Sequence, residues 1–283
     1  MTDPVPSPRQ LLENVGLGAH AERILPHELP AIAILLGTGA GDIGQSRIGG
    51  LPDLPASLAW PRTAKGEAME FTLQIDLAEL PPAASALPRA GMLYVFIGLD
   101  EPATNIEHRI LLHTGADPLH PAALPTDIPF ANDMFADVEP RRLEFVAVPD
   151  FPRWATQDFA AVTRDMSEDE HDTYNEDFMW SLEPNTASPM LGKLFGHAAG
   201  IGSDPREDAY VVREVNPKWL YNTRERTRLD LTPARSWRHL LTIDSCMALG
   251  LGIWDAGYLQ FLQHENDLEK LDFSRVYAAA ESS

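Results

Sequence analysis

Two distant segments of this chain share one order of features, and this internal similarity constrains the fold more than any other part of the sequence. The first segment runs from Phe71 to Thr114 and the second from Leu240 to Ala280. Each contains an apolar stretch ending in Ile-Asp, a loop, an Ala-Gly step, a stretch of alternating polarity, an acidic loop, and an arginine followed by apolar residues. The glycine and the arginine are the same number of residues apart in both segments. The pattern predicts one structural unit used twice.

The alternating stretches "MLYVFIG" and "YLQFLQH" indicate strands with one buried face. We therefore expect an α+β fold of duplicated, mostly antiparallel β-rich halves with flanking helices. The halves can pack around a pseudo-two-fold axis or pair edge to edge in one larger sheet, and both arrangements fit the sequence. Within one compact domain, the expected parts are an N-terminal helical segment with a strand (1–45), a first β-rich half (46–160), an acidic helical linker (161–190) and a second β-rich half (191–283).

Two aspartate–arginine pairs recur at matching places in the two segments. Asp76 and Arg109 belong to the first, and Asp244 and Arg275 to the second. An active site commonly uses one copy of a repeat and lets the other decay, whereas both copies are present here. We therefore interpret each pair as an ion pair that braces its own half.

An acidic helix is expected between the halves. Ser167 and Glu170 form a capping-box pattern, and Tyr174, Phe178 and Leu182 recur every four residues. No lysine or arginine occurs between Arg164 and Lys193, so the outer face has no local neutralising partner. We expect this face to bind a partner through Glu168, Asp169, Glu170, Asp172, Tyr174, Glu176, Asp177 and Trp180.

The charge balance narrows the classes of partner. There are 22 basic and 42 acidic residues, a formal net charge of −20 at pH 7. Such a surface repels phosphate backbones and anionic lipid, so nucleic-acid and membrane binding are not expected, and a basic protein is favoured. The alternatives are that the charge serves solubility alone, or that the basic stretch 213–239 covers acidic surface of the same molecule. With one cysteine, no signal-like N-terminus and no long apolar run, we expect a cytoplasmic protein.

Motifs for chemistry are weak. Gly39, Gly41 and Gly44 fit G-x-G-x-x-G, but glycines and prolines follow at once where a dinucleotide site needs a helix, so we interpret them as a loop. Cys246 is expected to be buried and inert. We therefore predict no catalytic residue, cofactor or metal. The proline-rich run from Gly49 to Trp60 can line a ligand groove or clamp the sheet, and we favour the clamp.

Three pieces of the chain together resemble the YwqG-like family of bacterial proteins. They are "GGLPDLP" with Trp60, "FTLQIDLAELP" with "LPRAGMLYVFIG", and the stretch from Trp237 to Val276. The resemblance covers roughly residues 46 to 280 and implies an α+β fold of duplicated β-rich halves. The family has no established reaction that could be assigned to this chain. The resemblance implies that genes of family members occur near bacterial toxin and immunity genes. A sequence motif that links the two halves in the family is only partly retained here, between Phe195 and Asp208.

These patterns favour a non-enzymatic acidic binding protein over an enzyme. The specific expectation is an immunity-type inhibitor that neutralises a basic toxin, such as a nuclease, through the acidic helix. The alternative is an enzyme or small-ligand sensor with a cleft between the duplicated halves, whose sign would be a pocket with convergent polar groups and a perturbed titratable residue. A structural or scaffold role is the third possibility.

Overall fold

One antiparallel sheet organises the molecule. The computed structural model describes residues 6–81, 86–99 and 104–282. In these residues ten strands are hydrogen-bonded in the order β12-β11-β10-β9-β1-β8-β2-β4-β5-β6, and β3 pairs separately with β7. The strands are β1 (Leu29–Leu36), β2 (Arg47–Ile48), β3 (Asp53–Pro55), β4 (Glu70–Asp76), β5 (Met92–Gly98), β6 (Glu107–His113), β7 (Leu119–Pro121), β8 (Arg141–Asp150), β9 (Met190–Phe195), β10 (Trp237–Asp244), β11 (Tyr258–His264) and β12 (Tyr277–Glu281).

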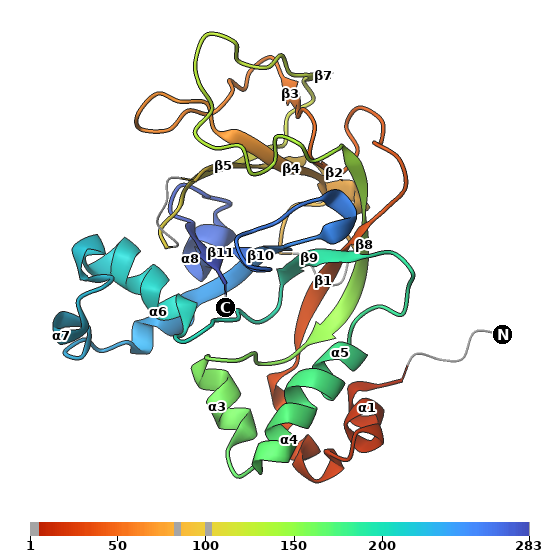
Figure 1. Cartoon of the computed structure of the whole chain (residues 1–283), viewed down its shortest axis with the longest axis vertical. Coiled ribbons are helices and arrows are strands. Elements are labelled where there is room, and N and C mark those ends of the chain that lie inside the picture. Colours follow the sequence, from red (N-terminus) through yellow and green to blue (C-terminus); the bar gives the residue numbers. More distant parts are fainter. Residues whose placement is uncertain (1–5, 82–85, 100–103, 283) are drawn as a thin grey trace.

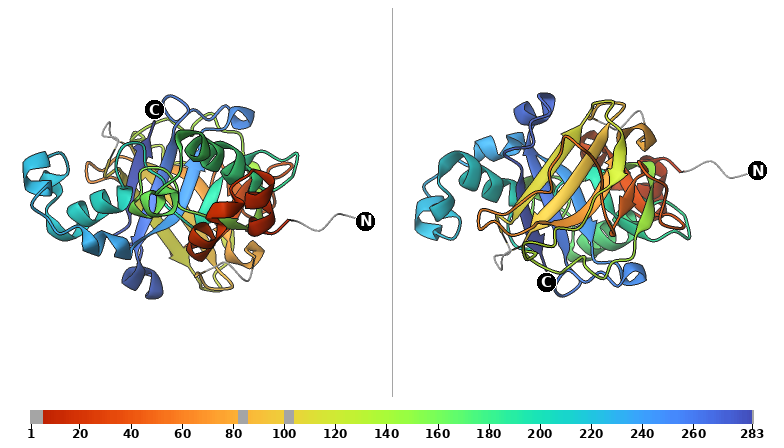
Figure 2. Two further views of the ribbon diagram at one scale, coloured as in Figure 1. Left: turned by 90° about the horizontal axis from the view of Figure 1, so that it is seen from below. Right: turned by 90° about the horizontal axis from the view of Figure 1, so that it is seen from above.

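The helices are short and lie outside this sheet. In Figure 1 the group from α1 to α5 lies below the strands β1, β9 and β10, while α6 and α7 extend to one side. Figure 2 shows the same group in front of the sheet when the molecule is seen from below. The helices are α1 (Pro8–Asn14), α2 (Ala21–Ile24), α3 (Gln157–Thr163), α4 (Glu168–Asp172), α5 (Met179–Ser181), α6 (Pro205–Tyr210), α7 (Thr223–Arg226) and α8 (Glu265–Glu269).

The sheet folds over onto itself at β8 and β2. The first two residues of β8 pair with β2, and the other eight pair with β1. Because β2 has only two residues, the connection between the two parts of the sheet is narrow at this point. Gly49 follows β2 with a φ of 71°, and a Cβ there would lie 2.5 Å from the carbonyl oxygen of Val138, so the turn requires glycine.

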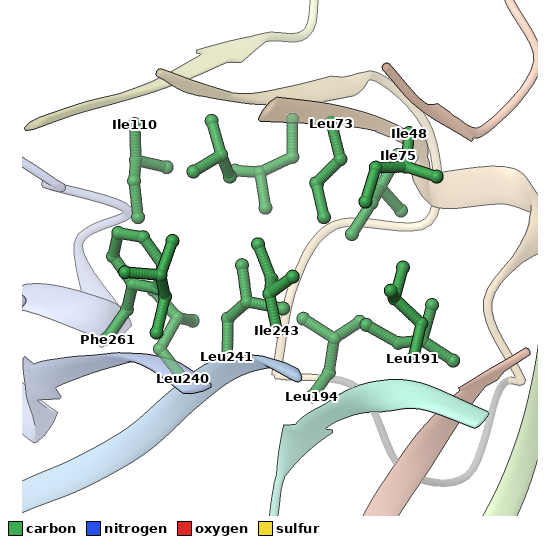
Figure 3. Close-up of a cluster of buried hydrophobic side chains, with 14 of the residues drawn as sticks. Ile48, Leu73, Ile75, Ile110, Leu191, Leu194, Leu240, Leu241, Ile243 and Phe261 are labelled. Carbon is green, nitrogen blue, oxygen red and sulfur yellow. The ribbon is translucent and has the colours of Figure 1, made fainter. Parts of the chain in front are cut away.

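The main hydrophobic core lies between the two parts of the folded sheet. Side chains of Leu73, Ile75 and Ile110 face those of Leu241 and Phe261 across it (Figure 3). The two outermost strands also meet, since the N–H of Ile106 donates to the carbonyl oxygen of Ala278 at 2.9 Å just before β6 begins. The sheet therefore approaches a closed barrel filled with side chains.

The two similar segments form two three-stranded meanders at opposite ends of the sheet order. The first meander is β4-β5-β6 and the second is β10-β11-β12. Asp76 pairs with Met92 in the first, and Asp244 pairs with Tyr258 in the second. Each meander has a register shift near the fourth residue before its aspartate. The expected α+β class with a mostly antiparallel sheet is confirmed.

The outer faces of the sheet carry smaller apolar clusters. On one side Leu12, Ile24 and Val162 from the helices pack with Phe151, which directly follows β8. On the other side Leu54 and Trp60 pack on the outer face of β4 and β5. The run from Gly49 to Trp60 thus covers the sheet, as a clamp does. None of the helices in the described ranges has the length and apolarity that a bilayer crossing needs.

Candidate functional site

The acidic helix forms where the sequence predicts it. α4 continues through a π-helical turn, Thr173–Phe178, into α5. Ser167 caps the start: its hydroxyl accepts from the N–H of Glu170 at 3.3 Å, and its own N–H donates to the Glu170 carboxylate at 2.8 Å. This reciprocal capping box satisfies two backbone donors and fixes the first residue of the helix.

The inner face of the helix is part of the core. Tyr174, Phe178 and Leu182 are buried, as the four-residue spacing predicts. The Tyr174 side chain is 0% exposed, and its hydroxyl donates to the carbonyl oxygen of Pro152 at 3.0 Å. The expectation that Tyr174 contacts a partner is therefore wrong, because the same periodicity that makes the helix amphipathic places this ring against Phe159 and Phe178.

The outer face presents five carboxylates and one large aromatic ring. Trp180 is 72% exposed. Glu170 is half-buried and differs from the rest, because His20 approaches its carboxylate at 2.9 Å. The hydrogen bonds from His20 and Ser167 lower the pKa of Glu170 to about 2. Within the described part of the chain, no ion pair reaches the exposed acids Glu168, Asp169, Asp172, Glu176 and Asp177.

The basic stretch 213–239 does not cover this helix. Its ion pairs go to α6, to α8 and to its own neighbours: Arg226 pairs with Asp208 and Glu207, and Arg238 with Glu265. The intramolecular alternative therefore applies to the acids of α6 and α8. It leaves the outer face of the acidic helix open to solvent.

The two expected braces do not form. Asp76 lies opposite Met92, which pairs with His113, whereas Arg109 lies four residues further along β6. At about 3.3 Å per residue, the carboxylate and the guanidinium are at opposite ends of the strand. Asp76 instead caps the turn after β4, accepting from the N–H of Ala78 at 3.0 Å. Arg275 pairs with Asp267 at 3.3 Å, and not with Asp244.

A buried charged network that the sequence patterns missed connects the end of β8 with β9 across β1, the strand between them. Asp150 accepts from Lys193 Nζ at 2.5 Å, from the N–H of His197 at 2.7 Å and from Arg153 at 3.0 Å. Burial lowers the pKa of Lys193 to about 8, and burial raises the pKa of nearby Asp244 to about 6. The available signal was a single lysine inside the apolar strand "MLGKLF". Asp150 is paired with two cations, which is typical of a structural network, while Nε of Arg153 has no hydrogen-bond partner in the described structure.

The family comparison covers both meanders and the acidic helix. A family model described as a domain of unknown function, DUF1963, matches residues 46–281. The chain belongs to the DUF1963 family. No curated protein matches the sequence. The match begins after β1. This strand, which lies between β8 and β9 in the sheet, is therefore outside the matched DUF1963 region.

A cleft between the two meanders of the DUF1963 domain has a volume of about 690 Å³ and is lined by β6 and residues 271–276. His108 lies in its wall, and burial lowers the pKa of this imidazole to about 4, so the ring is neutral at pH 7. Arg109 and Arg213 also line the cleft, and Nε of Arg213 is buried without a hydrogen-bond partner among the described residues. The cleft therefore has two cationic groups in a strongly acidic protein.

The remaining motifs of the DUF1963 chain have structural roles. The glycines from Gly39 to Gly44 form a loop with no helix after them, as expected. The N–H of Gly44 donates to the Asp53 carboxylate, which also pairs with Arg47 at 2.8 Å and anchors the clamp. Cys246 is buried.

Proposed function

We propose that this DUF1963 protein is a binding protein that recognises a basic protein partner through the outer face of the acidic helix, residues 168–181. The observation that carries the proposal is the group of exposed carboxylates without a described ion pair, beside an exposed indole. Opposite charge increases the rate of association, and a tryptophan that becomes buried contributes binding free energy. The helix is held rigidly by its cap and by its buried inner face, so little conformational entropy is lost on binding.

In its specific form, the proposal makes the partner a basic bacterial toxin, such as a nuclease, and this protein its cytoplasmic immunity-type inhibitor. An acidic helix can occupy the positively charged groove in which a nuclease binds the phosphate backbone of its nucleic-acid substrate. The resemblance to YwqG-like bacterial proteins supports this form. We further propose that the two meanders arose by duplication, since their registers match at Asp76 and Asp244.

The test measures association with a basic partner captured from the native host and then purified. A triple variant, Asp172→Lys, Glu176→Lys and Asp177→Lys, leaves the cap and the first turn intact. We expect its association rate to fall at least tenfold at low salt and to lose its dependence on ionic strength. The matched control reverses three exposed acids elsewhere: Asp42→Lys, Asp255→Lys and Glu269→Lys. Equal effects of the two triple variants would refute the acidic helix as the interface.

Trp180 provides an independent test. Trp180→Ala should raise the dissociation rate about tenfold or more, because truncation of an aromatic anchor removes buried contact area. Its effect on folding should be small, since the ring is exposed in the free protein. A dissociation rate equal to that of the wild type would remove Trp180 from the interface.

A second candidate function, binding of a small anionic ligand, is favoured by Arg213 in the cleft between the meanders, where its Nε is buried without a hydrogen-bond partner among the described residues while an Nη atom donates to the carbonyl oxygen of Val276. Thermal stabilisation by phosphate or succinate in the wild type, lost in Arg213→Gln, would support it. Equal stabilisation of both proteins would count against it.

A further inference from the structure

A second cavity lies on the outer face of the first meander, away from the acidic helix. It has a volume of about 480 Å³, within the range of small-molecule sites. Its walls come from the clamp, from the start of β4 and from the loop that precedes β8. The lining residues that matter here are Trp60, Phe71, Leu124, Phe130, Glu70 and Asp133.

Three aromatic rings give the cavity a rigid apolar wall. Trp60 is fixed by the hydrogen bond from its indole N–H to the carbonyl oxygen of Met69, at 2.7 Å. Its ring packs edge-on against Phe130 at a centroid distance of 6.0 Å. Phe71, the third ring, is itself in edge contact with Phe96 at 5.5 Å. Phe130 and Leu124 are partly exposed and form the mouth.

Glu70 lies in this apolar wall, and the hydrogen-bonding capacity of its carboxyl group is only partly satisfied. The residue is 5% exposed, and its Oε2 atom has no hydrogen-bond partner in the described structure. The backbone N–H groups of Phe135 and Met134 lie next to the carboxyl group and favour its charged form. Burial nevertheless raises its pKa to about 7, and Asp133 adds to this effect. A buried polar atom without a partner is uncommon in folded proteins, and this oxygen is free to accept a hydrogen bond from a ligand in the cavity.

The charge of the lining selects the class of ligand. Glu70 and Asp133 are acidic, and no lysine or arginine occurs among the described lining residues. Aromatic faces attract organic cations, and a carboxylate accepts a hydrogen bond from an ammonium group. We propose that this cavity is a binding site for a small apolar primary amine, whose ammonium group pairs with Glu70 and whose hydrocarbon part packs against Trp60, Phe71 and Phe130.

Calorimetric titration of the whole chain at pH 8 with phenethylammonium chloride tests the site. The matched ligand is 2-phenylethanol, which has the same ring and no charge. We expect the amine to bind at least tenfold more tightly than the alcohol, and Glu70→Gln to remove this preference. Glu269→Gln, an exposed glutamate at the end of α8, is the matched control and should bind the amine as the wild type does.

Two further measurements keep the test decisive if Glu70→Gln folds poorly. Phe130→Ala, at the partly exposed mouth, should weaken amine binding several-fold. Amine affinity of the wild type should fall when the pH is lowered from 8 to 6, because protonation of Glu70 removes the charge that pairs with the ammonium. Equal affinity for the amine and the alcohol, absence of amine binding, or an unchanged affinity in Glu70→Gln would each overturn the proposal.

Discussion

Lys193 Nζ lies 2.5 Å from Oδ2 of Asp150, and both side chains are buried where β8 ends beside the centre of the sheet. Burial alone would raise the pKa of Asp150, but the charges of Lys193 and Arg153 hold it well below its usual range. The pair joins β8 and β9 across β1, which lies between them. A charge pair thus sits on the outer side of the strands whose other side chains form the main core.

Removal of one partner of this pair should destabilise the protein strongly. Asp150→Ala leaves Lys193 buried without its carboxylate, and we expect a loss of about 3–5 kcal/mol in the free energy of unfolding. Urea denaturation at pH 7 measures it. Asp150→Leu combined with Lys193→Met should recover part of the loss, because neither charge then remains buried. A cost of Asp150→Ala no larger than that of the exposed control Asp255→Ala would contradict the structural role.

Glu70 should make the stability of the protein fall as the pH rises. Its pKa in the folded state is about 7, above the ordinary 4.5, so the folded protein binds more protons than the unfolded chain between these values. Relative to Glu70→Gln, the wild type should lose on the order of 2–3 kcal/mol of stability between pH 5 and pH 8. Urea denaturation of both proteins at pH 5 and pH 8 measures this. An equal difference in the free energy of unfolding between the two proteins at both pH values would show that Glu70 titrates normally. Asp133, the other acid of the cavity, is present in both proteins.

The close approach of Gly257 to β12 should not tolerate a side chain. A Cβ at Gly257 would overlap the carbonyl oxygen of Glu281, and one at Gly91 would lie 2.6 Å from that of His113. We expect Gly257→Ala and Gly91→Ala each to cost about 2–3 kcal/mol of stability. Gly252→Ala, where a Cβ has nothing within 4 Å, should change stability by less than about 0.5 kcal/mol and serves as the control. Thermal unfolding distinguishes the three variants, and a neutral Gly257→Ala would argue against the contact.

Asp76 and Arg109 should behave as independent residues. A double-mutant cycle with Asp76→Ala and Arg109→Ala should give a coupling free energy below about 0.5 kcal/mol, because the side chains lie at opposite ends of the first meander. A coupling free energy above about 1 kcal/mol would instead support the ion pair between Asp76 and Arg109 that the sequence predicts. Arg275 and Asp267, which are in contact, provide the positive comparison.

The parts of the fold that local patterns specify were predictable. The capping box at Ser167 and the apolar stripe through Tyr174 located the acidic helix, and two-residue alternation located β5 and β11. The same stripe shows why Tyr174 could not also be a contact residue. The aspartate–arginine braces failed because sequence spacing does not tell which end of a strand a residue occupies in three dimensions.

The order of strands and the cavity needed the structure. β1 pairs with β8 and β9, which come more than a hundred residues later, and no local signal specifies such partners. Glu70 stands alone in the apolar stretch "AMEFTL", as Lys193 does in its own strand. An isolated charge in a buried strand is therefore the sequence signal for both groups. Only the fold shows that Lys193 has a counter-charge and that Glu70 has an apolar cavity beside it.

The contact between Ile106 and Ala278 has a consequence for how the chain reaches its native state. Until residues 277–281 are in place, β11 keeps a row of unpaired amide and carbonyl groups, and Thr104 and Ile106 lack their partners in β12. Such an open edge is the kind of template on which other chains aggregate. A chain truncated before Tyr277 would leave the sheet open, with unpaired backbone groups at both of its edges. We expect such a fragment to aggregate into inclusion bodies while the intact chain stays in solution.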